Sequence, residues 1–504
     1  MTETASRPST EPLLDELRRR LGEIVDLRKT NMLLFWDQRV TMPTGGSEAR
    51  AEVAATVGKL VHELVVADEI GELLEELRPL EHELDYDSDD ASLLRVTRRD
   101  YEKARRVPPS LTAEMRRASA LALAAWGPAR EQSDFAALLP HLERNLELKQ
   151  QYVACFPTPE ETYDVLLDDY EEGMKTAEVR AIFERLKAEQ AKLVERDDDV
   201  DDSFLHRDFP ADRQREVALA AVRAFGFDEQ EWRLDQTAHP FASSVGPGDV
   251  RLTTNFRPDD LTSLFATMHE FGHGVYEHGV ARELGRTPIG SGTSLGVHES
   301  QSRMWENLVG RSRPFWRHFY PTLQRAFPEQ LGGVDEDTFY RAINKVQPSL
   351  IRIDADEVTY NLHIIVRFEL EQELIDGALA LADVPDAWNA RIADYIGVEV
   401  PDARRGVLQD MHWAAGLIGY FPTYALGNVI SGQIWERVRE DLPDLDEQME
   451  RGEFAPLREW LRERLYRHGR KFTPQETVER VTGNLIDPGP YLRYLREKLA
   501  PQPA

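Results

Sequence analysis

The chain of 504 residues carries 90 acidic side chains against 61 lysines and arginines, a formal net charge of −29. This excess of negative charge repels nucleic acid and anionic membranes, so neither is an expected partner. A hydrophobic content of 41% with 30% charged residues is typical of a globular protein. The one cysteine, Cys155, excludes an intramolecular disulfide; we interpret it as a small buried hydrophobe. With no signal-peptide pattern and no apolar run that could span a membrane, we expect a cytoplasmic protein.

The first part of the chain has helical periodicity. Residues 1–10 are polar, and we expect a disordered tail there. Leucines at helical spacing then predict a helix from Glu11 to Trp36, and the sequence MPTGG at 42–46 ends it. A second helix is predicted from Ser47 to Val66, and further amphipathic helices follow as far as Arg196. The acidic run DDDVDD at 197–202 is typical of a solvated loop.

The composition changes near Trp232, where Gly, Pro, Ser and Thr become frequent. WRLDQTA at 232–238 and DVRLTT at 249–254 alternate and predict two strands of a small sheet. Helices resume after this segment, and we expect one of them to start at Pro401 and Asp402. Length alone favours two or three domains, but no linker is apparent. We therefore predict a mainly α protein in which residues 1–504 form a single domain.

The segment from Leu261 to Gly279 contains the sequence HEFGH at 269–273. On a helix, His269 and His273 lie one turn apart on the same face, where both imidazoles can bind one metal ion. Glu270 can then reach a metal-bound water without being a ligand. The alternative is a solvated helix face, but apolar residues at helical spacing favour a buried helix. The small sheet is expected beside it.

A catalytic zinc site needs a third protein ligand and an open position. Glu299, at the start of a helix predicted over residues 294–310, is our candidate, and His298 is a competing ligand. Arg303 and Glu306 follow at helical spacing and can orient Glu299 or pair with each other. A simple surface ion pair is the alternative interpretation. His278 points elsewhere on its helix.

Several motifs in order resemble the carboxypeptidase Taq family of zinc-dependent metallocarboxypeptidases. They are HPF at 239–241, DVRLT at 249–253, HEFGH at 269–273, HESQ at 298–301, IRIDAD at 351–356, GVLQDMHW at 406–413 and GYFPTYALGN at 419–428. The resemblance covers nearly the whole chain. It implies a deep substrate groove, walled by the long N-terminal helices, with the metal on its floor.

The resemblance also implies a function and a set of metal ligands. His269, His273 and Glu299 would bind Zn²⁺, or Co²⁺, and Glu270 would be the general base. The substrates would be peptides with a free C-terminus, from which single residues are released with broad specificity and with proline disfavoured. The family is expected to be homodimeric. The nearer alternative is a helical zinc oligopeptidase or dipeptidyl carboxypeptidase, and the farther one is a non-catalytic peptide-binding scaffold.

The substrate carboxylate needs a cationic partner, and Arg352 is the choice that the resemblance implies, because a guanidinium binds a carboxylate bidentately. The alternative is an ion pair with a nearby acid: Asp354, Asp356 or Glu357. Arg251 is a rival for which we favour a structural role at a strand edge.

Two further groups of residues are candidates for the site. His412 and Tyr424 are candidate donors to the reacting carbonyl oxygen, although His412 can also be a core histidine held by Asp410. Tyr420 and His239 are expected to line the site and contact substrate.

Overall fold

The computed structural model describes residues 10–157, 159–194 and 200–500. Mainly α architecture with a small sheet is confirmed. The helices that precede the sheet are α1 (Glu11–Val40), α2 (Ser47–Val65), α3 (Asp68–Glu76), α4 (Arg78–Glu83), α5 (Asp89–Arg106), α6 (Pro109–Gln132), α7 (Phe135–Val153), α8 (Asp164–Leu167), α9 (Thr176–Val194) and α10 (Ala211–Phe225). Among the described residues, no helix is both long and apolar enough to cross a bilayer.

The helices that follow the sheet build the rest of the molecule. They are α11 (Thr262–Gly279), α12 (Leu295–Arg303), α13 (Arg313–Ala326), α14 (Pro328–Leu331), α15 (Glu336–Ile343), α16 (Tyr360–Ile375), α17 (Val384–Ile396), α18 (Pro422–Asp441), α19 (Leu445–Glu450), α20 (Ala455–Arg464), α21 (Pro474–Thr482) and α22 (Gly489–Lys498). A π-helix over Met304–Val309 continues α12 directly. The helix predicted over residues 294–310 therefore forms with a change of winding in its second half.

The sheet has three strands in the order β1-β3-β2: β1 (Trp232–Gln236), β2 (Ala242–Gly246) and β3 (Asp249–Thr254). β1 runs parallel to β3 with Trp232 opposite Val250, and β2 runs antiparallel to β3. The two predicted strands are confirmed, while β2 was not predicted. Arg251 lies on the central strand rather than at an edge, so that expectation was wrong.

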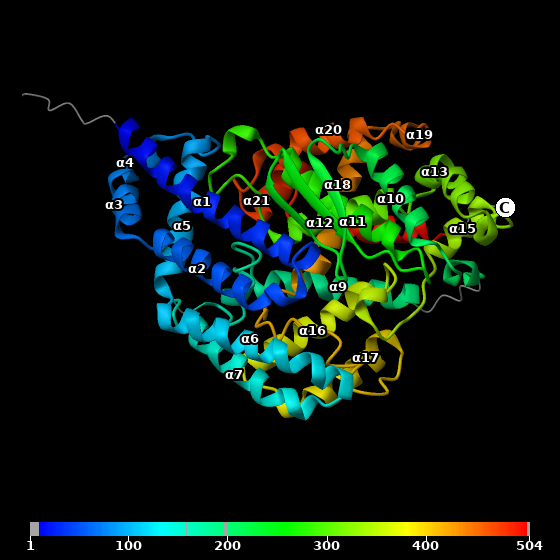
Figure 1. Ribbon diagram of the computed structural model, residues 1–504, viewed down its shortest axis with the longest axis horizontal. Helices are drawn as coiled ribbons and strands as arrows, with labels where there is room; N and C mark the ends of the chain where they lie inside the picture. The colour runs from blue at the N-terminus through cyan, green and yellow to red at the C-terminus, as the bar shows by residue number, and fades with distance from the viewer. Residues whose placement is uncertain (1–9, 158, 195–199, 501–504) are drawn as a thin grey trace, which may run out of the picture.

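Most buried side chains belong to one large core that joins the sheet to the helices after it. The N-terminal helices α1, α3 and α5 share a second apolar core, into which Leu284 and Ile289 insert from the segment after α11. In Figure 1 the sheet and α11 occupy the middle of the molecule, α1 and α2 lie to one side, and α6 and α7 lie below. The N-terminal helices thus stand next to the element that carries the histidines.

Two local predictions need correction, and two others fall wholly or partly outside the described residues. Residues 401–421 form turns instead of the helix expected at Pro401. The Asp402 carboxylate accepts from the Arg405 N–H as a helix-capping residue would, but only successive turns follow, and Gly416 and Gly419 adopt positive φ angles in the later ones. Cys155 is only partly buried, because it follows the end of α7 and packs with one side against a small cluster. The expected tail lies almost entirely outside the described residues, as does the first half of the acidic run at 197–202.

Candidate metal centre and active site

α11 positions the histidines because one side of it is buried as predicted. Leu264, Phe265 and Met268 are among its buried residues, and the helix extends to Gly279. Glycine is required at position 272 because α12 passes unusually close there. A Cβ on Gly272 would lie 2.5 Å from the Cα of Ser302. This contact brings the helix of Glu299 against the helix of the two histidines.

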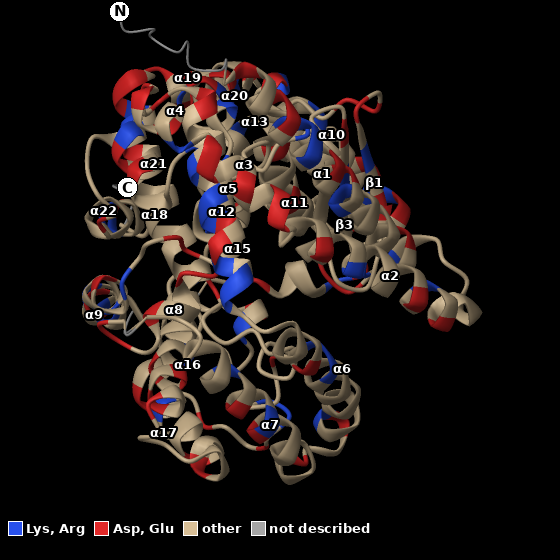
Figure 2. Ribbon diagram, turned by 90° about the vertical axis from the view of Figure 1, so that its left-hand side faces the viewer, with Lys and Arg blue, Asp and Glu red and all other residues tan. Residues whose placement is uncertain are grey.

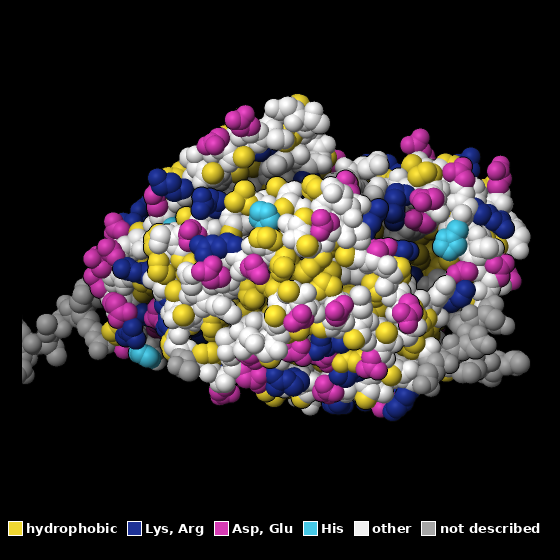
Figure 3. Space-filling model, turned by 90° about the horizontal axis from the view of Figure 1, so that it is seen from below, with side chains coloured by type: hydrophobic (Ala, Val, Ile, Leu, Met, Phe, Trp, Pro, Cys, Tyr) yellow, Lys and Arg dark blue, Asp and Glu magenta, His cyan; other side chains and the backbone are white. Residues whose placement is uncertain are grey.

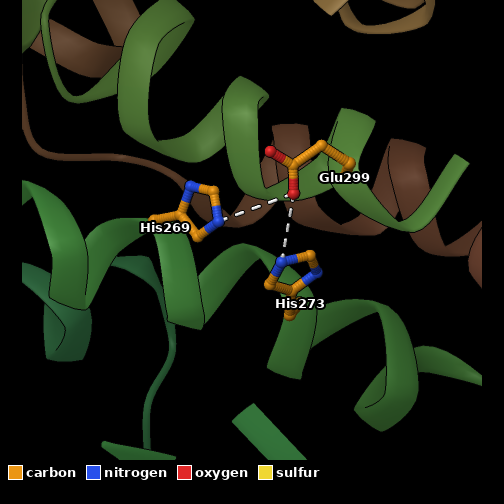
Figure 4. A group of neighbouring side chains, drawn as sticks. All are labelled: His269, His273 and Glu299. Carbon is orange, nitrogen blue, oxygen red and sulfur yellow. Dashed lines mark ion pairs between the residues drawn. The ribbon is translucent and has the colours of Figure 1, made fainter. Parts of the chain in front are cut away.

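His269, His273 and Glu299 converge at one point (Figure 4). Glu299 Oε2 lies 3.6 Å from His269 Nε2 and 3.4 Å from His273 Nε2. Ligands held about 2.1 Å from one ion in tetrahedral geometry lie roughly 3.4 Å apart. The spacing of these three atoms therefore fits one metal ion, and three ligands leave a further position open for water or substrate.

A layer of charged groups holds two of the ligands in place. His269 Nδ1 lies 2.8 Å from Glu306 Oε2, so its Nε2 is free to face the other ligands. Arg303 donates to Glu299 from Nε at 2.8 Å and to Glu306 from a terminal nitrogen at 3.3 Å. Both roles that the sequence suggested for Arg303 are therefore present. Although Glu299 is buried, Arg303 and the histidines hold the pKa of its carboxyl below the ordinary value.

His298 lies behind His273 and does not join the ligand group. Its Nδ1 is 2.8 Å from His273 Nδ1, and its Nε2 is 3.0 Å from Glu277 Oε1. An imidazole that binds metal through Nε2 carries its proton on Nδ1. His273 can then donate to His298, which donates in turn to Glu277. His278 forms an ion pair with Glu231 at 2.7 Å and points elsewhere, as predicted.

Glu270 is buried, with a side chain that faces the same cavity as the ligands. Burial raises the pKa of its carboxyl to about 7, against the opposing effects of His269 and of the backbone N–H of Ala242. A carboxyl with a pKa near neutrality can exchange protons with water and with an amine. Ala242 belongs to β2, so the strand that sequence patterns missed also contacts the candidate base.

A cavity of about 590 Å³ lies over these residues. Its walls come from α1, β2, the segment before α12, and the start of α18. Tyr420 and Tyr424 both line it, as the sequence suggested. His239 does not line it: the side chain is exposed on the bend before β2, and the neighbouring Pro240 and Phe241 line the cavity instead. The long N-terminal helix α1 forms a wall of the cavity, as expected.

Arg352 is buried and does not line the cavity. Its Nε and one terminal nitrogen donate to Asp410 Oδ1 at 3.1 and 2.8 Å, and the other terminal nitrogen donates to the Tyr360 hydroxyl at 2.9 Å. Asp410 also forms an ion pair with Arg367 at 2.6 Å. The ion-pair partner of Arg352 is thus Asp410 rather than one of its near neighbours in sequence. The guanidinium lies 5.0 Å from the centre of the Tyr424 ring, beneath the cavity wall.

His412 and Tyr424 lie together, with His412 Nε2 3.1 Å from the Tyr424 hydroxyl. On its other side His412 Nδ1 is 3.8 Å from Asp410. Burial lowers the pKa of His412 to about 4, so the ring is neutral near pH 7. Sequence reasoning missed Glu277, which lies one turn after His273 on the same helix, a spacing that could have revealed it.

Two histidines on one helix, a distant glutamate and a buried carboxyl beside them define a metal-dependent peptidase. The carboxypeptidase Taq (M32) metallopeptidase family model matches residues 16–499. The chain belongs to this family, and it is a metal-dependent carboxypeptidase.

Known proteins of this family are similar along nearly their full length. Thermostable carboxypeptidase 1 of Thermus thermophilus is 43% identical, with 95% of this chain and 96% of that protein covered. Carboxypeptidase 1 of Bacillus subtilis is 36% identical over 92% of this chain and 94% of its own. The crystal structure of the M32 carboxypeptidase from Deinococcus radiodurans R1 superposes with a TM-score of 0.92 at 40% identity, covering 97% of this chain and 98% of that one.

Proposed function

We propose that this carboxypeptidase releases single amino acids from the C-termini of peptides, with broad specificity and with proline disfavoured. His269, His273 and Glu299 would hold Zn²⁺, or Co²⁺ in its place. The observation that carries this proposal is the spacing of these three ligand atoms beside the buried Glu270. Bound zinc would lower the pKa of a coordinated water and polarise the scissile carbonyl.

Glu270 is the proposed general base. Its carboxylate accepts a proton from the attacking water and returns it to the leaving amine. Burial raises the pKa of Glu270 and so favours its protonated form, whereas a bound metal cation would favour the carboxylate that accepts the proton. The Ala242 N–H that donates to this carboxylate keeps it oriented toward the cavity.

Arg352 is proposed to bind the substrate's C-terminal carboxylate. A guanidinium has five N–H donors, and Asp410 and Tyr360 engage three of them. The remaining N–H groups of Arg352 can bind a carboxylate. Since Tyr424 lies between this guanidinium and the cavity, its ring has to turn aside when the substrate enters. The two hydrogen bonds to Asp410 hold the plane of the guanidinium in the orientation that would meet the substrate carboxylate.

His412 and Tyr424 are proposed to stabilise the oxyanion of the tetrahedral intermediate. The neutral imidazole and the phenol form one hydrogen-bonded pair. If His412 donates its Nε2–H to the phenol oxygen, the phenol O–H of Tyr424 is free to donate to the oxyanion. Tyr420, which also lines the cavity, is proposed to contact the substrate. His239, exposed outside the cavity two residues before Phe241, is proposed to contact the part of a peptide that extends beyond the cavity.

Two experiments test these assignments. In the first, Glu270→Gln should retain the metal and lose turnover by about 10²- to 10⁴-fold, the usual contribution of a general base. Glu283→Gln, at an exposed carboxyl outside the cavity, is the control and should keep full activity. Normal turnover by the Glu270 variant would refute the mechanism.

The second experiment identifies the products formed from a blocked dipeptide and from a tetrapeptide with a free C-terminus. Stepwise release of single residues is expected. Release of dipeptides, or internal cleavage, would favour the dipeptidyl carboxypeptidase or oligopeptidase alternative. Peptides ending in proline should be poor substrates.

We also propose a homodimer and a single domain over residues 1–504. The family resemblance supports the dimer, and sedimentation equilibrium would test it by giving twice the mass of one chain. The large core shared by the sheet and the later helices supports one domain. The lone cysteine supports a reducing, cytoplasmic compartment.

A further inference from the structure

A second cavity, of about 460 Å³, adjoins the cavity over the metal ligands. We call it the outer cavity; α1, α2, α6 and the residues at the start of β2 line it. The two cavities share five lining residues, so they lie side by side: Arg28, Met32, Phe241, Ala242 and Ser243. No residue of α18 lines the outer cavity. It therefore extends the site on the side of α1 and β2, away from Tyr424.

The charge of the outer cavity is unusual for this chain. Among the residues that the structure describes, the charged ones that line it are Arg28 from α1 and Arg116 from α6. The net charge of the whole chain is −29, and acidic side chains are spread over its helices (Figure 2). On the face seen in Figure 3, acidic and basic groups interleave around a central apolar area. A cavity lined by arginines with no acid among them departs from that pattern.

Neither arginine is neutralised by a direct partner. Within the described ranges, no carboxylate lies within ion-pair distance of Arg28 or Arg116. Asp100, whose charge acts on Arg28, is held by both terminal nitrogens of Arg470 at 2.7 and 2.8 Å. By contrast Arg50, on α2, forms an ion pair with Asp37 at 2.5 Å. The outer cavity thus offers two guanidinium groups to a ligand.

The residues on opposite sides of the cavity indicate the direction in which a peptide would lie across the site. If Arg352 holds the C-terminal carboxylate beneath Tyr424, the residues before the scissile bond extend toward α1 and β2. β2 is an edge strand, and Ala242 and Ser243 line both cavities. The outward backbone groups of β2 are already engaged, because the Ala242 N–H donates to Glu270 and Lys29 Nζ donates to the Ser244 carbonyl at 3.0 Å. Selectivity for a peptide here would therefore come from side-chain pockets, and the outer cavity can supply one.

We propose that the outer cavity binds side chains on the N-terminal side of the scissile bond, and that Arg28 and Arg116 select peptides with an acidic residue there. This inference rests on the proposed release of residues from the C-terminus, and it adds a substrate class to it. Met32, Phe35 and Phe241 also line the cavity, so they contact the aliphatic part of the acidic side chain. Lysine at the same position is disfavoured.

The test compares peptides that share their last two residues and carry Asp, Ala or Lys at the third or fourth position from the C-terminus. The expected kcat/KM order is Asp above Ala above Lys, with about a two- to fivefold preference from each arginine, the range of exposed ion pairs. The preference should weaken as salt is raised. Arg28→Gln and Arg116→Gln should each lower the ratio of Asp to Ala peptide, and the double variant should bring it close to one.

Arg117→Gln is the matched control, since Arg117 is exposed one residue further along α6 and lines neither cavity; it should leave the ratio unchanged. Equal kcat/KM for the three peptides, or a ratio that survives in the double variant, overturns the inference while leaving the proposed function intact. Failure to release single residues from any of the peptides would instead overturn the proposed function and this inference with it. Binding of the same peptides to Glu270→Gln, measured by fluorescence anisotropy, should show the same order of affinity.

Discussion

Gly272 is the point at which the two helices of the metal centre touch, so Gly272→Ala should separate the ligands they carry. The added Cβ would lie 2.5 Å from the Cα of Ser302, whereas ordinary contact begins at 3.4 Å. The backbones must therefore separate by at least about 0.9 Å (3.4 − 2.5), because the carbonyl oxygen of Gln301 lies closer still and neither backbone can rotate away. Overpacking of this kind typically costs about 1 to 3 kcal/mol of unfolding free energy.

Separation of the two helices would also lengthen the distances between the candidate metal ligands that they carry. Glu299 Oε2 lies 3.4 and 3.6 Å from the Nε2 atoms of His273 and His269. If the separation is fully transmitted, these distances become about 4.3 and 4.5 Å. Two ligands that each bind one zinc ion at about 2.1 Å are at most about 4.2 Å apart. Glu299 would then lose the ion, and metal affinity should fall by at least about 100-fold, the upper end of what substitutions behind a ligand cost.

Competition with a fluorescent zinc chelator measures this loss, and denaturant unfolding of the metal-free protein measures the stability change. Gly274→Ala is the matched control on the same helix. Its Cβ would lie 2.5 Å from the Trp232 ring, on the side of the sheet. It should cost stability and keep metal affinity. A folded Gly272→Ala protein that binds zinc as tightly as the natural chain would refute the argument.

His298→Ala and Glu277→Gln each interrupt the hydrogen-bonded chain behind the second histidine. Metal affinity should fall about 10- to 100-fold in the chelator assay, and unchanged affinity would show that the chain does not position the ligand. Burial raises the pKa of Glu171 from its ordinary 4.5 to about 8. Its stabilising contribution is complete below pH 4.5 and is lost as the pH rises toward 8. Denaturant titrations of Glu171→Gln should therefore show a smaller decline in unfolding free energy between pH 5 and 8; a slope equal to that of the natural chain would contradict this. Asp410→Asn leaves Arg352 buried without its carboxylate, so stability should drop by about 3 to 5 kcal/mol and KM should rise; a normal Tm and KM would show that the pair holds nothing in place.

The shared face of His269 and His273 was predictable from the sequence, because helical spacing alone determines it. The position of Glu299 follows from the second helix, and the structure brings it to the expected place. The partner of Arg352 was not predictable in the same way. Asp410 is 58 residues away in the chain, and only the tertiary fold brings it near. Sequence reasoning therefore offered the acids close to Arg352, none of which forms its ion pair.

Strand β2 was missed for a different reason. Its sequence, ASSVG, consists mostly of small residues that carry little intrinsic preference for a strand. Its conformation comes from pairing with β3, which is tertiary context. The turns of residues 401–421 are a similar case, because Pro401 followed by Asp402 also suits the start of a helix. Gly416 and Gly419 adopt positive φ angles in the later turns of that segment.

Helix α2 has no buried residue along its 19 positions. Val53 and Leu60 are 49% and 44% exposed, and yet Gly58 and Val61 line the outer cavity. A segment with so few buried contacts opens at much lower free energy than the core does. Its amide hydrogens should therefore exchange with solvent through local opening, while those of α11 exchange only through global unfolding. The α2 side of the outer cavity should therefore open more readily than the helix that carries the two histidines, through an equilibrium that is separate from the chemistry.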